Sequence, residues 1–250
     1  MTVSYAMTRT RILAAALSVA MAASAHAQDA SLAQRLDPQR NAETFSEDHL
    51  KTGRAIAKGG AQAGGVSMKC MACHGLAGAG GAQAPRLAAL PYDYLVTQIQ
   101  YFLNGNRASA IMAPISARLT PQEVHAVLAY YADLPPPDMT PPADLDWELV
   151  RAGELLAYAG RQQSGEAAEI TACVMCHNAV GDLDRVPIAP PLAGHSAGYI
   201  TDQLKAWRSG LRRGSPLGVM SRIAEAMTDE EIAAVAAFYA AQNPAETEAD

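Results

Sequence analysis

The sequence predicts an all-α fold made of two similar domains in tandem. The first observation is an internal repeat that covers most of the chain. The second is that each repeat ends in a helix with the same start signal and the same kind of apolar face. The third is that no segment shows the apolar–polar alternation of a half-buried strand. Two small domains also suit a chain of 250 residues.

The first 27 residues predict an export signal rather than part of either domain. Arg9 and Arg11 give a positive start, the run from Ile12 to Ala25 is apolar or small, and Ala25-His26-Ala27 is an A-x-A cleavage site. The apolar run is short for a membrane span, which needs about 20 residues. An uncleaved anchor is the alternative. We therefore expect residues 1–27 to be a signal peptide and the mature protein to be periplasmic.

The rest of the chain divides by composition and by the repeat. Residues 28–44 are polar without clear periodicity and predict a flexible N-terminal extension. Residues 135–145 are rich in proline, which favours an extended linker. This linker separates a first domain, residues 45–134, from a second domain, residues 146–243. Residues 244–250 are expected to form an acidic tail.

The repeat consists of residues that recur at nearly constant offsets. The offset grows from 103 to 105 and then to 108 residues, which places a two-residue insertion before Pro190 and a three-residue insertion before Met220. The two halves are therefore duplicates of one domain. The recurring pairs are Cys70/Cys173, Pro85/Pro190, Tyr94/Tyr199, Gln98/Gln203, Arg107/Arg212, Met112/Met220, Thr120/Thr228, Glu123/Glu231 and Tyr131/Tyr239.

Each repeat is expected to hold a first, a middle and a last helix. The last helix opens with a capping box, Thr120 to Glu123 and Thr228 to Glu231, in which threonine and glutamate satisfy backbone N–H groups reciprocally. The middle helix ends near a glycine, as helices commonly do. The other expected spans are from Ser46 to about Lys58, from near Asp146 onward, from about Tyr92 to Gly105, and from about Gly198 to Gly210.

All four cysteines lie in two copies of one pentapeptide, C-x-x-C-H, which is the attachment sequence for c-type haem. Two thiols at this spacing can each form a thioether to one vinyl group of the porphyrin. The next histidine supplies an imidazole nitrogen to the iron. We therefore predict two covalently bound haem c groups. The residues involved are Cys70, Cys73 and His74 in the first copy, and Cys173, Cys176 and His177 in the second.

Other chemistries of a cysteine pair stay open at this point. A single zinc site would usually place its two pairs about 12 to 20 residues apart, whereas these pairs are 103 residues apart. Two disulfides, or a thioredoxin-like redox site, would not call for a histidine after both pairs. A redox C-x-x-C would also be expected beside a βαβ pattern. The repeated histidine favours haem.

The second axial ligand of each iron is predicted to be a methionine. Met112 and Met220 occupy equivalent places, eight residues before the threonine cap of each last helix. A thioether favours ferrous iron, and His/Met ligation raises the reduction potential, which suits an electron carrier. Core packing is the alternative for any single methionine. Because His49, His125 and His195 are not repeated, ligation by two histidines is not expected, and these three are expected at the surface or partly packed.

Two further repeated pairs are candidates for the surroundings of the haem. A backbone carbonyl at Pro85 or Pro190 is placed to accept the Nδ1–H of the histidine ligand and fix its ring. A simple turn proline is the alternative. Arg107 and Arg212 are candidates to pair with haem propionates, because a guanidinium suits a carboxylate. Solvated surface arginines are the competing interpretation.

The charge of the chain bears on its partners. The formal net charge is −6 at pH 7, and removing residues 1–27 takes away two positive charges, so the mature chain stands at −8. An acidic protein is not suited to bind nucleic acid. No nucleic-acid partner is expected.

Together these motifs resemble the dihaem class I c-type cytochromes of the cytochrome c4 type, over about residues 45–243. The resemblance implies two haem-c domains related by a pseudo-twofold axis. The four cysteines, the two motif histidines and the two methionines match the haem ligands of that family position by position. The chain departs from the family at residues 87–90, Leu-Ala-Ala-Leu, where the family tends to have Leu-Ala-Gly.

The resemblance implies a periplasmic electron carrier in respiratory electron transfer, with no substrate chemistry of its own. The alternative is the cytochrome subunit of a periplasmic dehydrogenase complex. A dihaem enzyme, of the peroxidase or thiosulfate-oxidising type, is not favoured, because both methionines are present and no fifth cysteine offers a thiolate. The implied partners are redox proteins, such as a membrane quinol–cytochrome c reductase, a terminal oxidase or a periplasmic dehydrogenase. Membrane association would be peripheral, through such partners.

Overall fold

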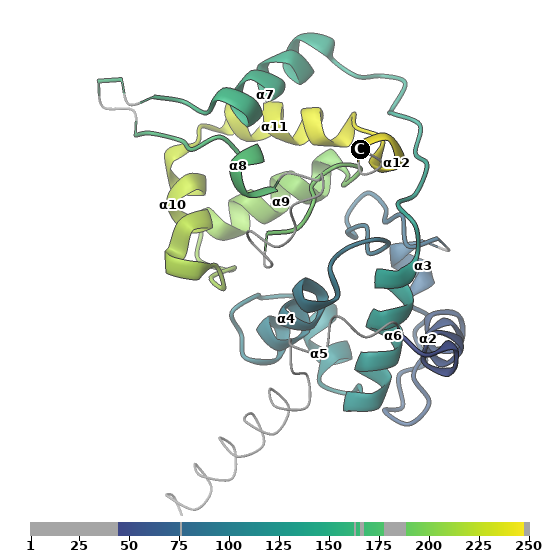
Figure 1. Cartoon of the computed structure of the whole chain (residues 1–250). Coiled ribbons are helices and arrows are strands. Elements are labelled where there is room, and N and C mark those ends of the chain that lie inside the picture. The colour runs from purple at the N-terminus through teal and green to yellow at the C-terminus, as the bar shows by residue number, and fades with distance from the viewer. Residues whose placement is uncertain (1–44, 76, 163, 166–167, 178–188, 248–250) are drawn as a thin grey trace, which may run out of the picture. The chain divides into compact units, whose positions relative to one another are not determined.

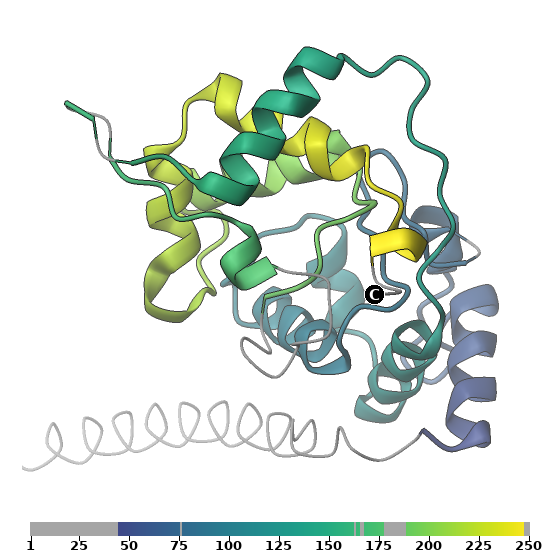
Figure 2. The same ribbon diagram turned by 45° about the horizontal axis from the view of Figure 1, so that its top comes forward.

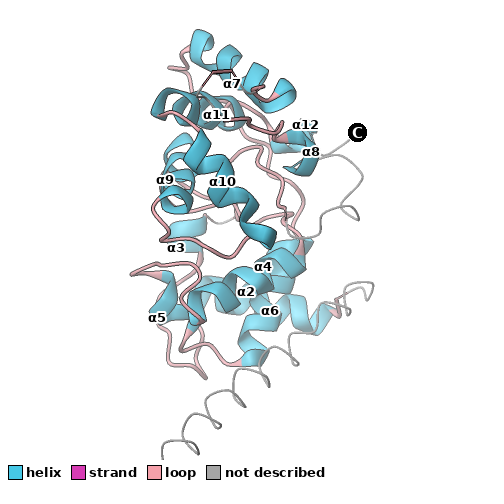
Figure 3. Ribbon diagram, turned by 90° about the vertical axis from the view of Figure 1, so that its left-hand side faces the viewer, coloured by secondary structure: helices cyan, strands magenta, loops and turns pink. Residues whose placement is uncertain are grey.

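Helices form the regular structure of the described residues. In this computed structural model, all secondary structure described is helical apart from three isolated β-bridges, and no strand is drawn in Figure 3. The predicted all-α class is therefore confirmed for this part of the chain. The expected signal peptide and N-terminal extension lie outside it. The structure describes residues 45–75, 77–162, 164–165, 168–177 and 189–247.

The helices follow the order expected from the repeat (Figure 1). The first half holds α2 (Glu47–Gly59), α3 (Met71–His74), α4 (Tyr92–Leu103), α5 (Met112–Ser116) and α6 (Pro121–Asp133). The second half holds α7 (Trp147–Ala159), α8 (Val174–His177), α9 (Ala197–Arg208), a short 3₁₀ turn (Pro216–Gly218), α10 (Val219–Ala226), α11 (Asp229–Ala240) and α12 (Pro244–Thr247).

The first and last helices of each half pack closely, α2 on α6 and α7 on α11. Figure 2 shows the second pair from another side, with yellow α11 lying against α7. A glycine makes each close crossing possible. A Cβ at Gly53 would lie 2.0 Å from the backbone oxygen of Ala126, and a Cβ at Gly153 would lie 2.0 Å from that of Ala234. The repeated glycines therefore mark the same helix crossing in both domains.

The expected helix starts are present with their side-chain caps. Thr120 and Thr228 each accept a hydrogen bond from the backbone N–H three residues later, and both capping boxes are complete. Ser46 caps α2 and Asp146 caps α7 in the same manner. Such caps stabilise a helix by about 1 kcal/mol each. These starts were readable in the sequence because a cap involves only neighbouring residues.

The middle helices end as predicted, and three further helices were not expected. Gly105 and Gly210 follow the ends of α4 and α9 with φ of 76° and 73°, a left-handed conformation that favours glycine. The additional helices are α5, α10 and α12. Helix α12 begins with Pro244, whose side chain is fully buried, so the segment expected as an acidic tail starts in contact with the second domain.

None of the helices in the described residues combines the length and the apolar composition needed to cross a bilayer.

Candidate functional site

The two C-x-x-C-H motifs each form one short helical turn. In α3 the backbone N–H of His74 donates to the carbonyl of Cys70 at 3.0 Å, and in α8 the N–H of His177 donates to that of Cys173 at 2.9 Å. One turn places both thiols and the imidazole of a motif on a single small element. None of the four cysteines is joined in a disulfide.

Both motif histidines are held by a proline carbonyl. His74 Nδ1 lies 3.0 Å from the Pro85 oxygen, and His177 Nδ1 lies 2.8 Å from the Pro190 oxygen. A carbonyl can only accept, so Nδ1 carries the proton and donates, and Nε2 keeps its lone pair. Burial lowers the pKa of both rings, although the hydrogen bond to proline opposes this. Each imidazole is therefore neutral and oriented, which is the state that binds iron.

Local backbone contacts bring the Pro85 carbonyl to His74. The N–H of Gly80 donates to the His74 carbonyl at 2.8 Å, and the N–H of Leu87 donates to the Gly78 carbonyl at 2.8 Å. A Cβ at Gly80 would lie 2.6 Å from the backbone nitrogen of Arg86, so the loop closes only with glycine there. The loop thus doubles back on the haem motif.

A cavity of about 220 Å³ lies beside the second motif. Its walls combine the two thiols and the imidazole of the second C-x-x-C-H motif, the thioether of Met220, and a majority of apolar and aromatic side chains. The other lining residues include Leu192, Ile200, Leu204, Trp207, Val219, Ile223, Met227, Val235 and Tyr239.

The residues around this cavity fit a haem c group. Cys173 and Cys176 supply the sulfur atoms for two thioethers, and His177 supplies a neutral imidazole. The apolar walls suit a porphyrin ring. No group of three or more histidines, cysteines or acidic residues that could hold a metal ion is found among the described residues.

The two methionines stand at the start of equivalent helices, Met112 as the first residue of α5 and Met220 as the second residue of α10. The backbone N–H of Met112 donates to Ser109 Oγ at 3.0 Å, and that of Met220 donates to Ser215 Oγ at 3.1 Å. The structure brings Met220 to the same cavity as His177. Met112 opens α5, which packs on α4. The serine contacts fix where each methionine stands although the loops before them differ in length.

Arg107 and Arg212 are buried between the two halves rather than solvated. The guanidinium of Arg107 donates to Gln98 of its own half at 2.8 Å and to Tyr199 of the other half at 2.7 Å. That of Arg212 donates to Gln203 of its own half at 2.9 Å and to Gln98 at 3.0 Å. The two arginines also form an antiparallel backbone bridge. Sequence reasoning did not foresee this exchange between the halves.

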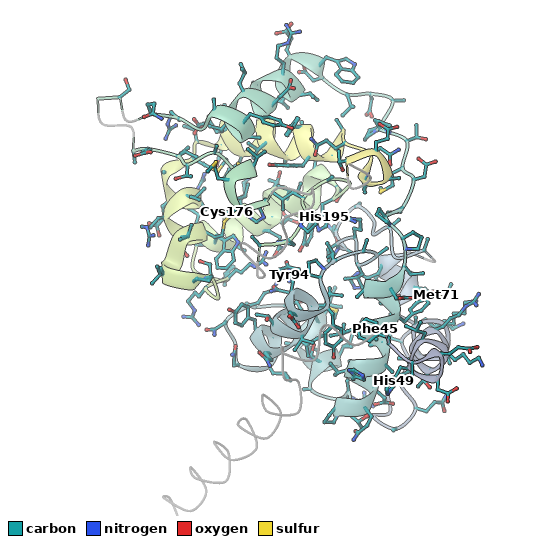
Figure 4. The ribbon with its side chains drawn as sticks, viewed as in Figure 1. Phe45, His49, Met71, Tyr94, Cys176 and His195 are labelled. Carbon is teal, nitrogen blue, oxygen red and sulfur yellow. The ribbon has the colours of Figure 1, made fainter. Side chains whose placement is uncertain are left out.

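The expectation for His195 was wrong. It was expected at the surface or partly packed, but its side chain is only 3% exposed and it lines the second cavity. Figure 4 shows it with Cys176 and with Tyr94 of α4, near where the two halves meet. The guanidinium groups that approach it, those of Arg86, Arg107 and Arg212, come from both halves of the chain, so a pattern within one repeat does not record these neighbours.

Comparison with known proteins decides the family. The family model for cytochrome c matches this chain twice, over residues 57–135 and 162–240. This chain belongs to the cytochrome c family. The two matches confirm the predicted pair of tandem domains and the prediction of two covalently bound haem c groups.

Two relatives of this cytochrome c protein are named as an electron acceptor and as a cytochrome c4. It is 42% identical, over 69% of its length and 78% of the relative, to a thiosulfate dehydrogenase electron acceptor of Thiomonas intermedia (strain K12). It is 35% identical, over 72% of its length and 88% of the relative, to a cytochrome c4 of Thiocapsa roseopersicina. The predicted c4-type resemblance is confirmed, and the chain is an electron carrier rather than a catalytic enzyme.

Two solved structures share the fold. Reduced recombinant cytochrome c4 from Pseudomonas stutzeri aligns with a TM-score of 0.60 and 26% identity, over 69% of this chain and 93% of that one. The thiosulfate dehydrogenase (TsdBA) from Marichromatium purpuratum aligns with a TM-score of 0.66 and 35% identity, over 80% of this chain. The cytochrome c protein spans only 41% of that second chain.

Proposed function

We propose that this protein is a periplasmic dihaem carrier in which each iron is bound by one histidine and one methionine. The ligands would be His74 and Met112 in the first domain, and His177 and Met220 in the second. The observation that carries the proposal is that one cavity is lined by the two thiols of the second C-x-x-C-H motif, the imidazole of His177 and the thioether of Met220. Repetition of the same residues extends the assignment to the first domain.

The protein's own groups suit electron transfer rather than catalysis at iron. Bound haem c supplies a one-electron couple between ferric and ferrous iron. The Pro85 and Pro190 carbonyls fix the imidazole rings, which limits rearrangement when the charge changes. With one histidine and one methionine bound, each iron would have no coordination position left for a substrate. The proposal therefore accounts for a carrier without substrate chemistry.

We propose that Arg107 and Arg212 also contact the haem propionates, in addition to their hydrogen bonds with residues of both halves. Arg212 lines the second cavity, and its Nε has no hydrogen-bond partner among the described residues. Buried cations need compensating negative charge, and a propionate carboxylate supplies it. The glutamine and tyrosine contacts would then hold each guanidinium in place.

The methionine assignment is tested by the far-red sulfur-to-iron absorption of the ferric protein. Met112→Ala and Met220→Ala should each remove about half of this band, because each removes one of two equivalent ligands. Met68→Ala is the matched control, because Met68 is exposed. A wild-type protein with two haems and no such band would contradict the assignment.

A second function is favoured by the relatives. Two proteins that are 42% and 38% identical to this chain are thiosulfate dehydrogenase electron acceptors. We propose that this cytochrome accepts electrons from a thiosulfate dehydrogenase. Ferric cytochrome mixed with such an enzyme and thiosulfate should be reduced within the enzyme's turnover time. Enzyme or thiosulfate alone should leave it ferric, and equally slow reduction in all three mixtures would exclude this partner.

The cellular location is proposed from the N-terminal sequence. Export would begin the mature chain near Gln28, after the Ala25-His26-Ala27 site. N-terminal sequencing of the protein purified from a periplasmic fraction measures this directly. Purification from native membranes would show whether a catalytic subunit accompanies it, and so separate a freestanding carrier from a subunit.

A further inference from the structure

One position differs in chemistry between the two halves although both copies are buried. His195 is 3% exposed and Leu90, its counterpart at the same offset as the surrounding residues, is 1% exposed. Leucine needs no hydrogen bond. A buried imidazole does, because a polar group that is removed from water without a partner destabilises the folded protein. The second half therefore carries a polar group whose retention calls for an explanation.

The imidazole of His195 has an unused nitrogen at the second haem cavity. Its Nδ1 is buried and has no hydrogen-bond partner among the described residues. His195 lines the same cavity as Cys176 and His177. Arg212 also lines that cavity, and its Nε is likewise buried without a partner there. Two unsatisfied nitrogen atoms in one cavity indicate an acceptor that occupies it.

Positive charge surrounds this nitrogen. Arg86, Arg107 and Arg212 are all buried, and Tyr199 of α9 lies against the His195 ring at 5.2 Å between centroids. Burial lowers the pKa of His195 to about 3, and the three guanidinium groups add to the lowering. The backbone at Ala193 acts in the opposite direction and raises the pKa. The surroundings thus favour an anion next to the ring.

We propose that His195 donates a hydrogen bond from Nδ1 to a propionate carboxylate of the second haem and makes the potential of that haem depend on pH. The inference rests on the proposed function, in which Cys173, Cys176 and His177 hold this haem. At the equivalent position of the first domain stands Leu90, which can neither donate a hydrogen bond nor titrate. His195 would then distinguish two otherwise matched redox sites.

The direction of the pH dependence follows from charge. A carboxylate beside the ring favours the imidazolium, so an attached haem raises the pKa of His195 above its low value. Reduction adds one electron and removes one positive charge at the iron, which raises the pKa further. The reduced protein therefore binds a proton from solvent more readily. Between the pKa of His195 in the oxidised protein and its pKa in the reduced protein, the potential of the second haem falls as pH rises. The reduction equilibrium changes by at most tenfold per pH unit, which is about 59 mV.

The test is a redox titration of the whole holoprotein at several pH values. Covalent haem is counted first, so that loss of the second haem, which would contradict the proposed function, is distinguished from failure of this inference. In the wild type, the reduction potential of one haem should fall more steeply with rising pH than that of the other, over the pH range in which His195 titrates. His195→Leu copies Leu90 and should abolish this difference, while the potential at the other haem stays the same.

Two outcomes would overturn the inference. One is a wild type in which the two potentials have the same pH dependence. The other is a His195→Leu protein with two haems and an unchanged slope. Should that variant fail to fold, His195→Gln takes its place. Glutamine can still donate a hydrogen bond but cannot titrate, so the slope should be lost, and a retained slope would exclude His195 as its source.

Discussion

The two haem domains keep the same attachment residues but differ in what surrounds them. The histidine-to-proline hydrogen bond measures 3.0 Å in the first domain and 2.8 Å in the second, although the second carries two more residues between the partners. The two extra residues therefore leave this contact in place. Duplication preserved the geometry that orients the imidazole.

The methionine side shows the same pattern. Met112 opens a five-residue helix, α5, whereas Met220 lies in the eight-residue α10, after a 3₁₀ turn in which Leu217 has a φ of 51°. Leu217 is also 89% exposed. In both domains a serine hydroxyl holds the backbone N–H of the methionine. In both domains a local contact therefore anchors the methionine, while the loops before the two methionines differ.

The equivalent capping glutamates also serve different neighbours. Glu123 accepts hydrogen bonds from the backbone N–H groups of Ala63 and Gly64, and so ties the loop before the first haem motif to α6. Glu231 instead pairs with Arg161. One capping residue therefore supports a haem-motif loop through neutral donors and the other through an ion pair.

The largest expected effect is loss of one haem. Replacing Cys70 and Cys73 by alanine removes both thioether positions of the first motif, and replacing Cys173 and Cys176 removes those of the second. Each double variant should carry one covalent haem, because each domain has its own motif. Covalent haem per chain, measured by absorbance, checks this. Loss of both haems from either variant would mean that the two domains do not mature independently.

A smaller effect is expected at the helix crossings. Gly53→Ala and Gly153→Ala should each destabilise the protein by about 1–3 kcal/mol, because the new Cβ would lie 2.0 Å from a backbone oxygen of the partner helix. Alanine normally stabilises a helix relative to glycine by about 1 kcal/mol, so the sign is reversed. The measurement is denaturant unfolding of the holoprotein.

Gly59→Ala is the matched control for these crossings. Gly59 belongs to α2, and a Cβ there would meet nothing within 4 Å. This variant should be neutral or slightly stabilised. Equal stability changes at Gly53 and Gly59 would show that the close approach of α2 and α6 does not limit stability.

The smallest effect is expected at Glu123, the capping glutamate of the first domain. Burial acts to raise the pKa of Glu123, but hydrogen bonds from Thr120, Gly64 and Ala63 outweigh it, so the pKa lies below its usual value. A lowered folded-state pKa stabilises the protein above the unfolded pKa, and that stability is lost as pH falls through the folded value. Glu123→Gln should therefore cost about 1 kcal/mol near neutral pH, and less in acid. Unfolding free energies at a series of pH values measure it.

Glu231→Gln is the companion variant. It breaks an ion pair whose side chains are 23% and 22% exposed, Arg161 and Glu231. If both glutamine variants show the same dependence on pH and on salt, the distinction drawn between the two capping residues does not hold.

The sequence by itself determined the features that depend on neighbouring residues. The C-x-x-C-H turns, the caps at Ser46, Thr120 and Thr228, and the glycine ends of the middle helices each involve groups only a few residues apart. Such local contacts form wherever the pattern occurs, so the repeat alone predicted two helical haem domains. The histidine-to-proline contact was also within reach, because a single loop joins its partners.

Only the tertiary structure decided what lies between the halves. Arg107 meets Tyr199 and Arg212 meets Gln98, contacts that join residues 92 and 114 positions apart. His195 is buried for the same reason, as guanidinium groups of both halves approach it. Contacts between residues so far apart depend on how the two domains pack against each other, and this packing depends on the surfaces of both. The sequence pattern of one repeat therefore cannot predict which residues of the other repeat it contacts.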